Sequence, residues 1–303
     1  MKAYGQWSYK CYIFSVFNYT LLALMGILMI IPFWYVIVMS FNEGTDTALG
    51  GILYFPRSFT LDNFKAVFAD KRVISSFGIS VSRLLIGTPL HLLVIGMAGW
   101  AVSRKKLPFR KVIVGMILIS MFVNAGLIPF YLTLSAYGLI NHYLVYILPT
   151  LFSGWELMIL VTAIRAIPES LIESARLDGA SDYRIFFQII APLTKATFAT
   201  IGLFNAVWAW GDWYTGTFLI SSNKLWSIAT YLQMVLQRGL SIQIRSAADA
   251  ANAVNALKGG QSTLTESSLR AATLVVTVVP IMCVYPFLQK YFIHGIMLGS
   301  IKE

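Results

Sequence analysis

Three ionisable side chains lie within long apolar stretches of the chain, where a charge is costly and its presence points to a function. They are Arg83, Glu156 and Asp212. Asp212 belongs to the sequence VWAWGDWY, which also contains Trp208, Trp210 and Trp213. Indole faces pack on the apolar faces of sugar rings, and a carboxylate accepts hydrogen bonds from sugar hydroxyl groups. We therefore expect these six residues to line a carbohydrate site.

A structural interpretation of the same residues stays open. The tryptophans can form part of an aromatic belt at the outer surface of a membrane, and Asp212 can pair with a buried cation. Arg83 can extend toward the interface, pair with Glu156 or Asp212, or meet an anionic substrate. The residue types alone do not decide between these roles.

The composition indicates that the bilayer is the solvent of the protein. Of 303 residues, 57% are hydrophobic and 12% are charged, and the mean hydropathy is +0.71. These values lie well outside the range of soluble globular domains. A net charge of +10 would suggest a nucleic-acid partner in a soluble protein, but membrane proteins gain Lys and Arg from topology. We expect membrane lipid around the chain and no nucleic acid.

Six apolar runs are long enough to cross a bilayer, which needs about 20 residues of helix. They lie at about 13–39, 75–101, 110–131, 139–163, 193–220 and 271–293. The first run follows Lys2 and Lys10 but is much longer than the apolar core of a signal peptide, which has about 7–15 residues. We expect an all-α membrane protein with six transmembrane helices.

The charges of the loops predict the orientation of these helices. The link between the second and third runs reads SRKKLPFRK and holds five Lys or Arg residues within eight positions. Cytoplasmic loops carry such an excess of basic residues. Both termini and the link between the fourth and fifth runs then also face the cytoplasm, and residues 40–74, 132–138 and 221–270 face outward.

The link between the fourth and fifth runs is the most polar part of the chain and contains ESARLDGASDYRIFFQIIAP. Pro168 suits the first position of a helix, and Glu169 suits its first turn. Asp178 and Gly179 supply a stop and a turn, and Ser181 can cap a second short helix. We expect two short helices along the membrane surface, although a solvated loop without further function would have the same pattern.

This segment resembles the cytoplasmic signature of ABC importer permeases, the EAA loop, in residue type and spacing. The matching residues are Glu173, Ala175, Asp178, Gly179, Ala180, Phe186, Ile189 and Pro192. Ser174 replaces the second Ala of the motif, and Ala191 replaces a usual Leu. From about residue 20 onward, including WAWGDW and YPFLQKYFIHGIMLGSIK, the chain resembles carbohydrate-type permeases of the branch linked to complex or acidic, alginate-like oligosaccharides.

The resemblance implies a type I importer fold, with one permease domain over residues 1–303 and a coupling helix between the fourth and fifth spans. It also implies a multi-pass protein of the bacterial inner membrane. Residues 168–190 would dock into a cytoplasmic ATPase subunit, so that closure of the ATPase pair rotates the permease helices. The residues expected to serve this coupling are Glu173, Ala175, Asp178, Gly179, Ala180 and Phe186.

Several partners follow from the resemblance. They are two ATPase subunits, an extracytoplasmic solute-binding protein, and a second permease subunit, which we expect to be a homologue rather than a copy. The chain contains no G-x-x-x-x-G-K-[ST] phosphate loop, so ATP and Mg would bind to the ATPase subunits. No Ser/His/Asp, Cys/His or paired-carboxylate arrangement occurs in a polar context, and no Cys or His residues cluster at metal-ligand spacing. We expect no enzyme activity, bound cofactor or metal in this chain.

The cargo is less closely defined by the sequence. The outward segments carry nine Lys or Arg residues against six Asp or Glu residues, which is compatible with acidic oligosaccharides such as uronate chains. The long segment at 221–270 is placed to contact the solute-binding protein. An ion-coupled secondary sugar transporter is the main alternative, but it predicts inverted repeats that the sequence does not show. A membrane scaffold is the other alternative, and the cluster at 208–213 argues against it.

Overall fold

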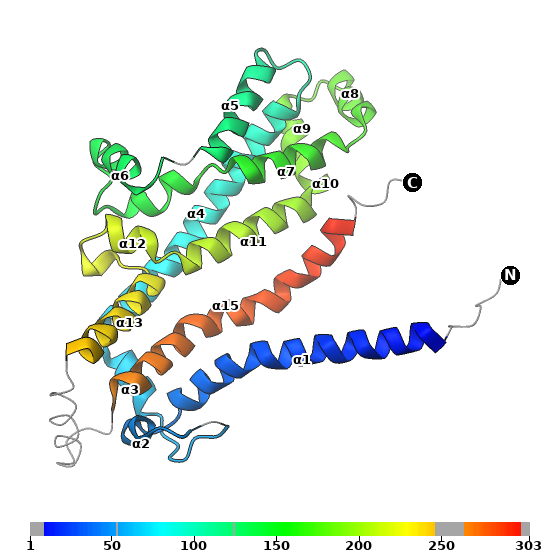
Figure 1. Cartoon of the computed structure of the whole chain (residues 1–303). Helices are drawn as coiled ribbons and strands as arrows, with labels where there is room; N and C mark the ends of the chain where they lie inside the picture. The colour runs from blue at the N-terminus through cyan, green and yellow to red at the C-terminus, as the bar shows by residue number, and fades with distance from the viewer. Residues whose placement is uncertain (1–8, 53, 124, 246–263, 298–303) are drawn as a thin grey trace. The chain divides into compact units, whose positions relative to one another are not determined.

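The computed structural model describes residues 9–52, 54–123, 125–245 and 264–297 (Figure 1). Within these ranges the chain forms helices of very different lengths and no β-strand. The predicted all-α class is therefore confirmed. Contacts within the chain define two compact units, which are described separately. The first contains Met1–Ala69 and Val235–Val276, and the second contains Asp70–Met234 and Thr277–Glu303.

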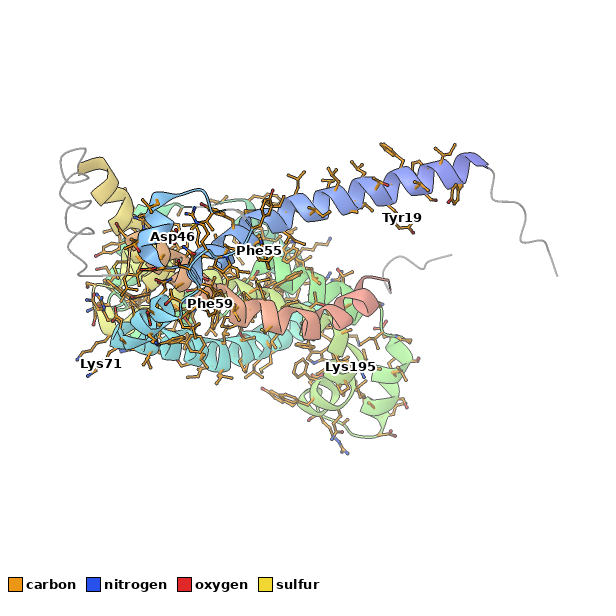
Figure 2. All side chains as sticks on the ribbon, turned by 90° about the horizontal axis from the view of Figure 1, so that it is seen from below. Tyr19, Asp46, Phe55, Phe59, Lys71 and Lys195 are labelled. Carbon is orange, nitrogen blue, oxygen red and sulfur yellow. The ribbon has the colours of Figure 1, made fainter. Side chains whose placement is uncertain are left out.

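The first unit is dominated by the long helix α1, Tyr9–Ser40. Its 32 residues would extend about 48 Å at about 1.5 Å per residue, more than the hydrocarbon thickness of about 30 Å. Most of its large apolar side chains are exposed. Tyr19, labelled in Figure 2, is 73% exposed. The helix therefore presents an apolar surface suited to lipid or to another membrane protein, and it contains the predicted span at 13–39.

A buried polar network holds two short helices to the end of α1. These are α2, Gly44–Leu49, and α3, Asp62–Ala69. The side chain of Asn42 donates to Asp46 and Thr47 and accepts a bond from the backbone of Ser58. Asn63 donates to the carbonyl oxygens of residues 40 and 42. These two amides satisfy several backbone groups at once and so hold this polar segment together.

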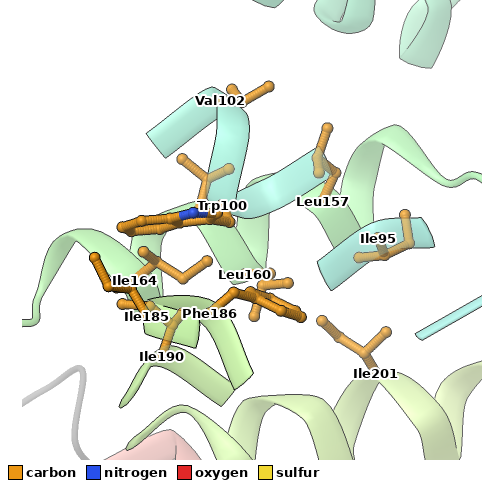
Figure 3. Packing of buried hydrophobic residues seen from close by; sticks show 11 residues of the cluster. Ile95, Trp100, Val102, Leu157, Leu160, Ile164, Ile185, Phe186, Ile190 and Ile201 are labelled. Carbon is orange, nitrogen blue, oxygen red and sulfur yellow. The ribbon is translucent and has the colours of Figure 1, made fainter. Parts of the chain in front are cut away.

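The second unit is built around helix α4, Lys71–Ser103, which contains the predicted span at 75–101. It packs against α7, Gly154–Arg165, and α11, Lys195–Gly211. Gly96 and Gly99 lie where the side chains of Phe186 and Leu160 approach α4, and small residues of this kind allow membrane helices to pack closely. Figure 3 shows the core that results, formed by Ile95, Trp100, Val102, Leu157, Leu160, Val161, Ile164, Ile185, Phe186, Ile190 and Ile201.

Three of the predicted spans are interrupted, in contrast to the single helices that we expected. The span at 110–131 consists of α5, Arg110–Phe122, and α6, Leu127–Ala136, because Val123 is extended and Gly126 adopts a positive φ of 79°. The span at 139–163 consists of two 3₁₀ turns, Tyr143–Tyr146 and Leu148–Thr150, followed by α7. Pro149 lies in the second turn, where its missing N–H disfavours a longer helix.

The third interruption is at Asp212, which separates α11 from α12, Tyr214–Leu219. Three helices are long and apolar enough to cross a membrane, Tyr12–Ser40, Lys71–Ser103 and Glu266–Cys283, within the residues described. Two bent pairs would raise this number to five if each pair is one span, with bends of 44° at residues 143–165 and 82° at residues 182–211. Three of the six predicted spans are thus interrupted, and the other three lie within single helices.

The predicted outer segment at 221–270 is largely helical where it is described. A short 3₁₀ turn at Asn223–Leu225 leads to α13, Ile228–Arg245, and α15, Glu266–Met297, begins before the predicted boundary of the last span. The amphipathic pattern at the start of this segment is therefore that of a helix. Residues 246–263, the middle of the segment expected to contact the solute-binding protein, lie outside the described residues.

Candidate functional site

Arg83 and Asp212 form a buried ion pair at the break between α11 and α12. The Nη2 atom of Arg83 donates to Oδ2 of Asp212 at 2.8 Å, and the two side chains are 2% and 4% exposed. The guanidinium lies 4.8 Å from the ring of Tyr146 and 5.3 Å from that of Trp208. Of the three roles open to Arg83, pairing with Asp212 is the one observed, since a buried side chain does not extend to the interface.

Asp212 has a structural role in the backbone around it. Its Oδ1 atom accepts a hydrogen bond from the N–H of Thr215 at 3.0 Å and so caps α12. Its carbonyl oxygen accepts from the hydroxyl of Ser227, just before α13. The alternative in which Asp212 pairs with a buried cation is therefore correct. Direct binding of substrate by Asp212 stays a prediction, because the residue also lines a cavity.

That cavity, called here the first cavity, has a volume of about 600 Å³ and lies wholly in the second unit. Its walls include Val145, Thr150, Trp208, Asp212 and Trp213. Trp208 and Trp213 are 53% and 40% exposed, so that their rings are available to a ligand. The structure thus brings these two tryptophans and Asp212 together around one space, as the carbohydrate interpretation requires.

Trp210 does not belong to this cavity, in contrast to our expectation. It is buried, its Nε1 atom donates to the carbonyl oxygen of Thr277 at 3.0 Å, and its ring packs edge-on against Phe77. Residues two positions apart on a helix point about 200° apart, so Trp208 and Trp210 face opposite sides of α11. Trp210 therefore holds the helices together, and the spacing alone could have indicated this.

Glu156 lies apart from the first cavity and contacts a histidine. Its Oε2 atom is 2.9 Å from Nε2 of His91, outside hydrogen-bond geometry, and both side chains are buried. The Nδ1 atom of His91 lies 2.8 Å from the carbonyl oxygen of Thr150 and must be the donor, since a carbonyl oxygen only accepts. Glu156 is therefore not the partner of Arg83, and no spacing or motif predicted its contact with His91.

These two residues line a second cavity of about 380 Å³, also within the second unit. Trp155, Phe204, Asn205 and Trp208 line it as well. The two cavities share Pro149, Thr150 and Trp208. A periodicity in α4 could have indicated His91, because Arg83, Gly87, His91 and Ile95 are all buried and follow each other at four-residue intervals, on one face of the helix.

The segment that resembles the EAA loop folds as its local sequence predicts. Helix α8, Glu169–Leu177, ends at Asp178, and Gly179 adopts a positive φ of 77°. The N–H groups of Gly179 and Ala180 donate to the carbonyl oxygens of Arg176 and Ala175, which is a Schellman motif. The hydroxyl of Ser181 accepts from the backbone of Arg184 and caps α9, Asp182–Ile185. Pro168 precedes the helix by one residue.

Within this segment, some apolar side chains are buried against the protein, whereas the acidic residues face outward. Phe186 is buried at the start of a π-helical turn, Phe186–Ile190, and its ring packs on Gly96 and Phe198. Ala175 and Ala180 pack against the same core. Glu173 and Asp178 are exposed. The expected anchoring position of Phe186 is therefore observed, and the exposed carboxylates are accessible to another protein.

Ion pairs connect the segment to the basic loop after α4, and Figure 1 shows α5 and α8 at the same end of α4. The ammonium group of Lys105 donates to Glu169 at 2.7 Å, which lowers the pKa of Glu169 and raises that of Lys105. Arg104 lies 3.7 Å from Asp182. The basic loop after α4 and the segment that contains α8 and α9 therefore form one polar surface.

Comparison with known proteins identifies the class of this chain. Residues 71–298 match the family model described as "Binding-protein-dependent transport system inner membrane component". Protein LplC of Bacillus subtilis is 32% identical over 96% of this chain and 95% of its own length. The polygalacturonan/rhamnogalacturonan transport system permease protein YtcP of the same organism is 30% identical, over 96% of this chain and 98% of its own length.

The chain therefore belongs to the family of inner-membrane components of binding-protein-dependent transport systems. It is a multi-pass permease of an ABC importer, as the EAA-like residues predicted. A crystal structure of a bacterial ABC transporter for import of the acidic polysaccharide alginate has the same fold, with a TM-score of 0.82 over 95% of this chain, 99% of the other chain and 24% identity.

Proposed function

We propose that this chain is one of two permease subunits of an ATP-driven importer that carries oligosaccharides, including uronate-containing ones, from a solute-binding protein into the cytoplasm. The family itself depends on binding proteins. YtcP, which matches nearly the whole chain, is named for polygalacturonan and rhamnogalacturonan, both of which contain galacturonate. The second permease subunit is a homologous chain that completes the path.

In this proposal the chain crosses the membrane six times. The third crossing is formed by α5 and the residues up to α6, and the fourth and fifth are the two bent pairs. Both termini and the polar surface of α8 face the cytoplasm, because the basic loop that contacts α8 carries the positive charge typical of that side. Trp208 and Trp213 contact the sugar rings as the substrate passes through the first cavity.

The proposal rests on one observation: residues 168–190 have one side buried against the protein and one side exposed. Phe186 is buried against α4, whereas Glu173 and Asp178 are exposed beside Leu177, which is 89% exposed. An exposed apolar side chain among charges is suited to the cleft of a soluble protein. The partner is an ATPase subunit, which binds the ATP and Mg, and Phe186 transmits its movement to the helix bundle.

Purification of the tagged chain from its own membranes in a mild detergent tests this proposal. We expect mass spectrometry to identify an ATPase subunit and a second permease in stoichiometric amounts. Replacing the exposed Leu177 by Glu should release the ATPase and retain the second permease, because only the apolar contact of the coupling segment is changed. Recovery of the chain without an ATPase, in a detergent that preserves other importers, would contradict the proposal.

A further inference from the structure

The second cavity combines aromatic rings with hydrogen-bonding groups in a way that suits a sugar ring. Trp155 is 52% exposed and lies with its ring centroid 5.5 Å from that of Phe204. Trp208 contributes its indole from α11. The volume of about 380 Å³ falls within the range of about 300–1,000 Å³ that is usual for ligand cavities. The aromatic surface can therefore pack on the apolar face of a glycosyl unit.

The polar groups of the cavity are fixed by bonds to the protein. The ring of His91 is held by its Nδ1–H bond to Thr150, and the carboxylate of Glu156 lies in the first turn of α7, where the helix dipole favours an anion. The Oδ1 atom of Asn205 accepts from the hydroxyl of Thr88 at 2.9 Å. Among the described residues Nδ2 of Asn205 has no hydrogen-bond partner, so it can donate to a ligand.

The charge in the cavity determines which sugar it can take. Glu156 lines the wall, and no Lys or Arg is among the lining residues. A carboxylate accepts bonds from hydroxyl groups but repels another carboxylate at short range in a water-poor cavity. Arg83 is instead placed near the first cavity, where Trp208 and Asp212 contact it and also line the wall. The two cavities thus differ in their charge environment.

We propose that the second cavity is a subsite for a neutral glycosyl unit, selected by Glu156 and Trp155. It adjoins the first cavity at Pro149, Thr150 and Trp208, so one oligosaccharide can occupy both. This inference rests on the proposed transport of oligosaccharides. It predicts that the importer distinguishes neutral from acidic units at this subsite by the charge of Glu156.

Two probes with the same rings test the subsite. They are trigalacturonate and its fully methyl-esterified form, which share the same sugar rings and differ in the charge and in the ester methyl groups. The complete importer is reconstituted with its own binding protein, and kcat/KM for uptake is measured for both probes. In E156Q, the ratio of the acidic probe to the ester should rise about tenfold, because an isosteric neutral side chain removes the repulsion. The binding protein is unchanged, so a change in this ratio is caused by the permease.

Matched variants separate a role in selection from a role in folding. E43Q removes a glutamate charge outside both cavities, and its ratio should equal that of the wild type. Trp155→Ala should lower uptake of the ester about tenfold, and Trp155→Phe should restore most of it, because the aromatic face is retained. Parallel loss of both probes in E156Q, with an unchanged ratio, would overturn the subsite alone. Uptake of neither probe by the wild-type importer would overturn the proposed cargo and the subsite with it.

Discussion

The guanidinium of Arg83 in α4 and the carboxylate of Asp212, 129 residues further along the chain, lie 2.8 Å apart in the interior of the protein. This single contact joins the central helix of the second unit to the break between α11 and α12. Because Asp212 also caps α12 and accepts from Ser227, the pair fixes three segments at the edge of the first cavity.

Removing one member of this pair should destabilise the complex strongly. Asp212→Ala leaves the cation of Arg83 buried without a partner, and such a change costs about 3–5 kcal/mol in the free energy of unfolding. Thermal unfolding of the purified complex measures the effect. The exposed pair of Lys65 and Asp62 supplies the control, since Lys65→Ala removes an ion pair that solvent screens and should leave the stability almost unchanged. An assembled, stable D212A complex with normal transport would contradict both the structural and the substrate-binding role.

Gly96 should be essential for the buried position of the Phe186 ring. A Cβ atom at this position would lie 2.9 Å from Cζ of Phe186, so Gly96→Ala must displace a ring of the core, at about 1–3 kcal/mol. The displaced Phe186 should also reduce the stimulation of ATP hydrolysis by the binding protein. Gly78→Ala in the same helix is the matched control, because a Cβ there meets nothing within 4 Å. Equal stimulation in both variants would show that Phe186 does not transmit the movement.

Gly179 should be required for the turn of the coupling segment. Its φ of 77° is costly for any residue with a Cβ, and Gly179→Ala should cost about 1–2 kcal/mol locally. Nothing lies within 4 Å of the added Cβ, so the effect comes from the backbone alone. We expect weaker co-purification of the ATPase in G179A and partial recovery in Gly179→Asn, since Asn tolerates this conformation better. Identical recovery of the ATPase from all three proteins would show that the turn is not used in docking.

Much of this local geometry could be predicted from the sequence, whereas the contacts around the cavities could not. Asp178, Gly179 and Ser181 act through bonds to residues a few positions away, so their types and spacing are sufficient. The partners of Arg83 and Glu156 come from distant helices, and several candidates were chemically equivalent. The interruption at Gly126 was also not predicted, because the apolar residues on both sides of it predict one continuous span.

The Asp70 carboxylate should contribute a pH-dependent part of the stability. It caps α4 and accepts bonds from Arg72 and from the hydroxyl of Tyr231, and the bonds from Arg72 lower the pKa of Asp70 to about 2. Because the folded pKa lies below the ordinary value of 3.8, the contribution is complete above pH 3.8 and is lost as the pH falls toward about 2.

Comparison of wild type with Asp70→Asn isolates this contribution, since Asn keeps the cap and removes the charge. The wild-type complex should be more stable by about 1 kcal/mol, a modest value because both side chains are partly exposed to solvent. The difference in melting temperature should be constant from about pH 8 to 5 and should shrink only below about pH 4. A difference that vanished near pH 6 would point to another titrating group.

Uptake into proteoliposomes tests the central claim, that this permease imports oligosaccharides with energy delivered through its coupling segment. The complete importer is reconstituted with ATP enclosed on the ATPase side and with the binding protein and trigalacturonate outside. Uptake should require both enclosed ATP and the binding protein, and L177E should abolish it while leaving the two permeases assembled. Uptake that continued without ATP and followed an imposed ion gradient would contradict the account and favour a secondary transporter.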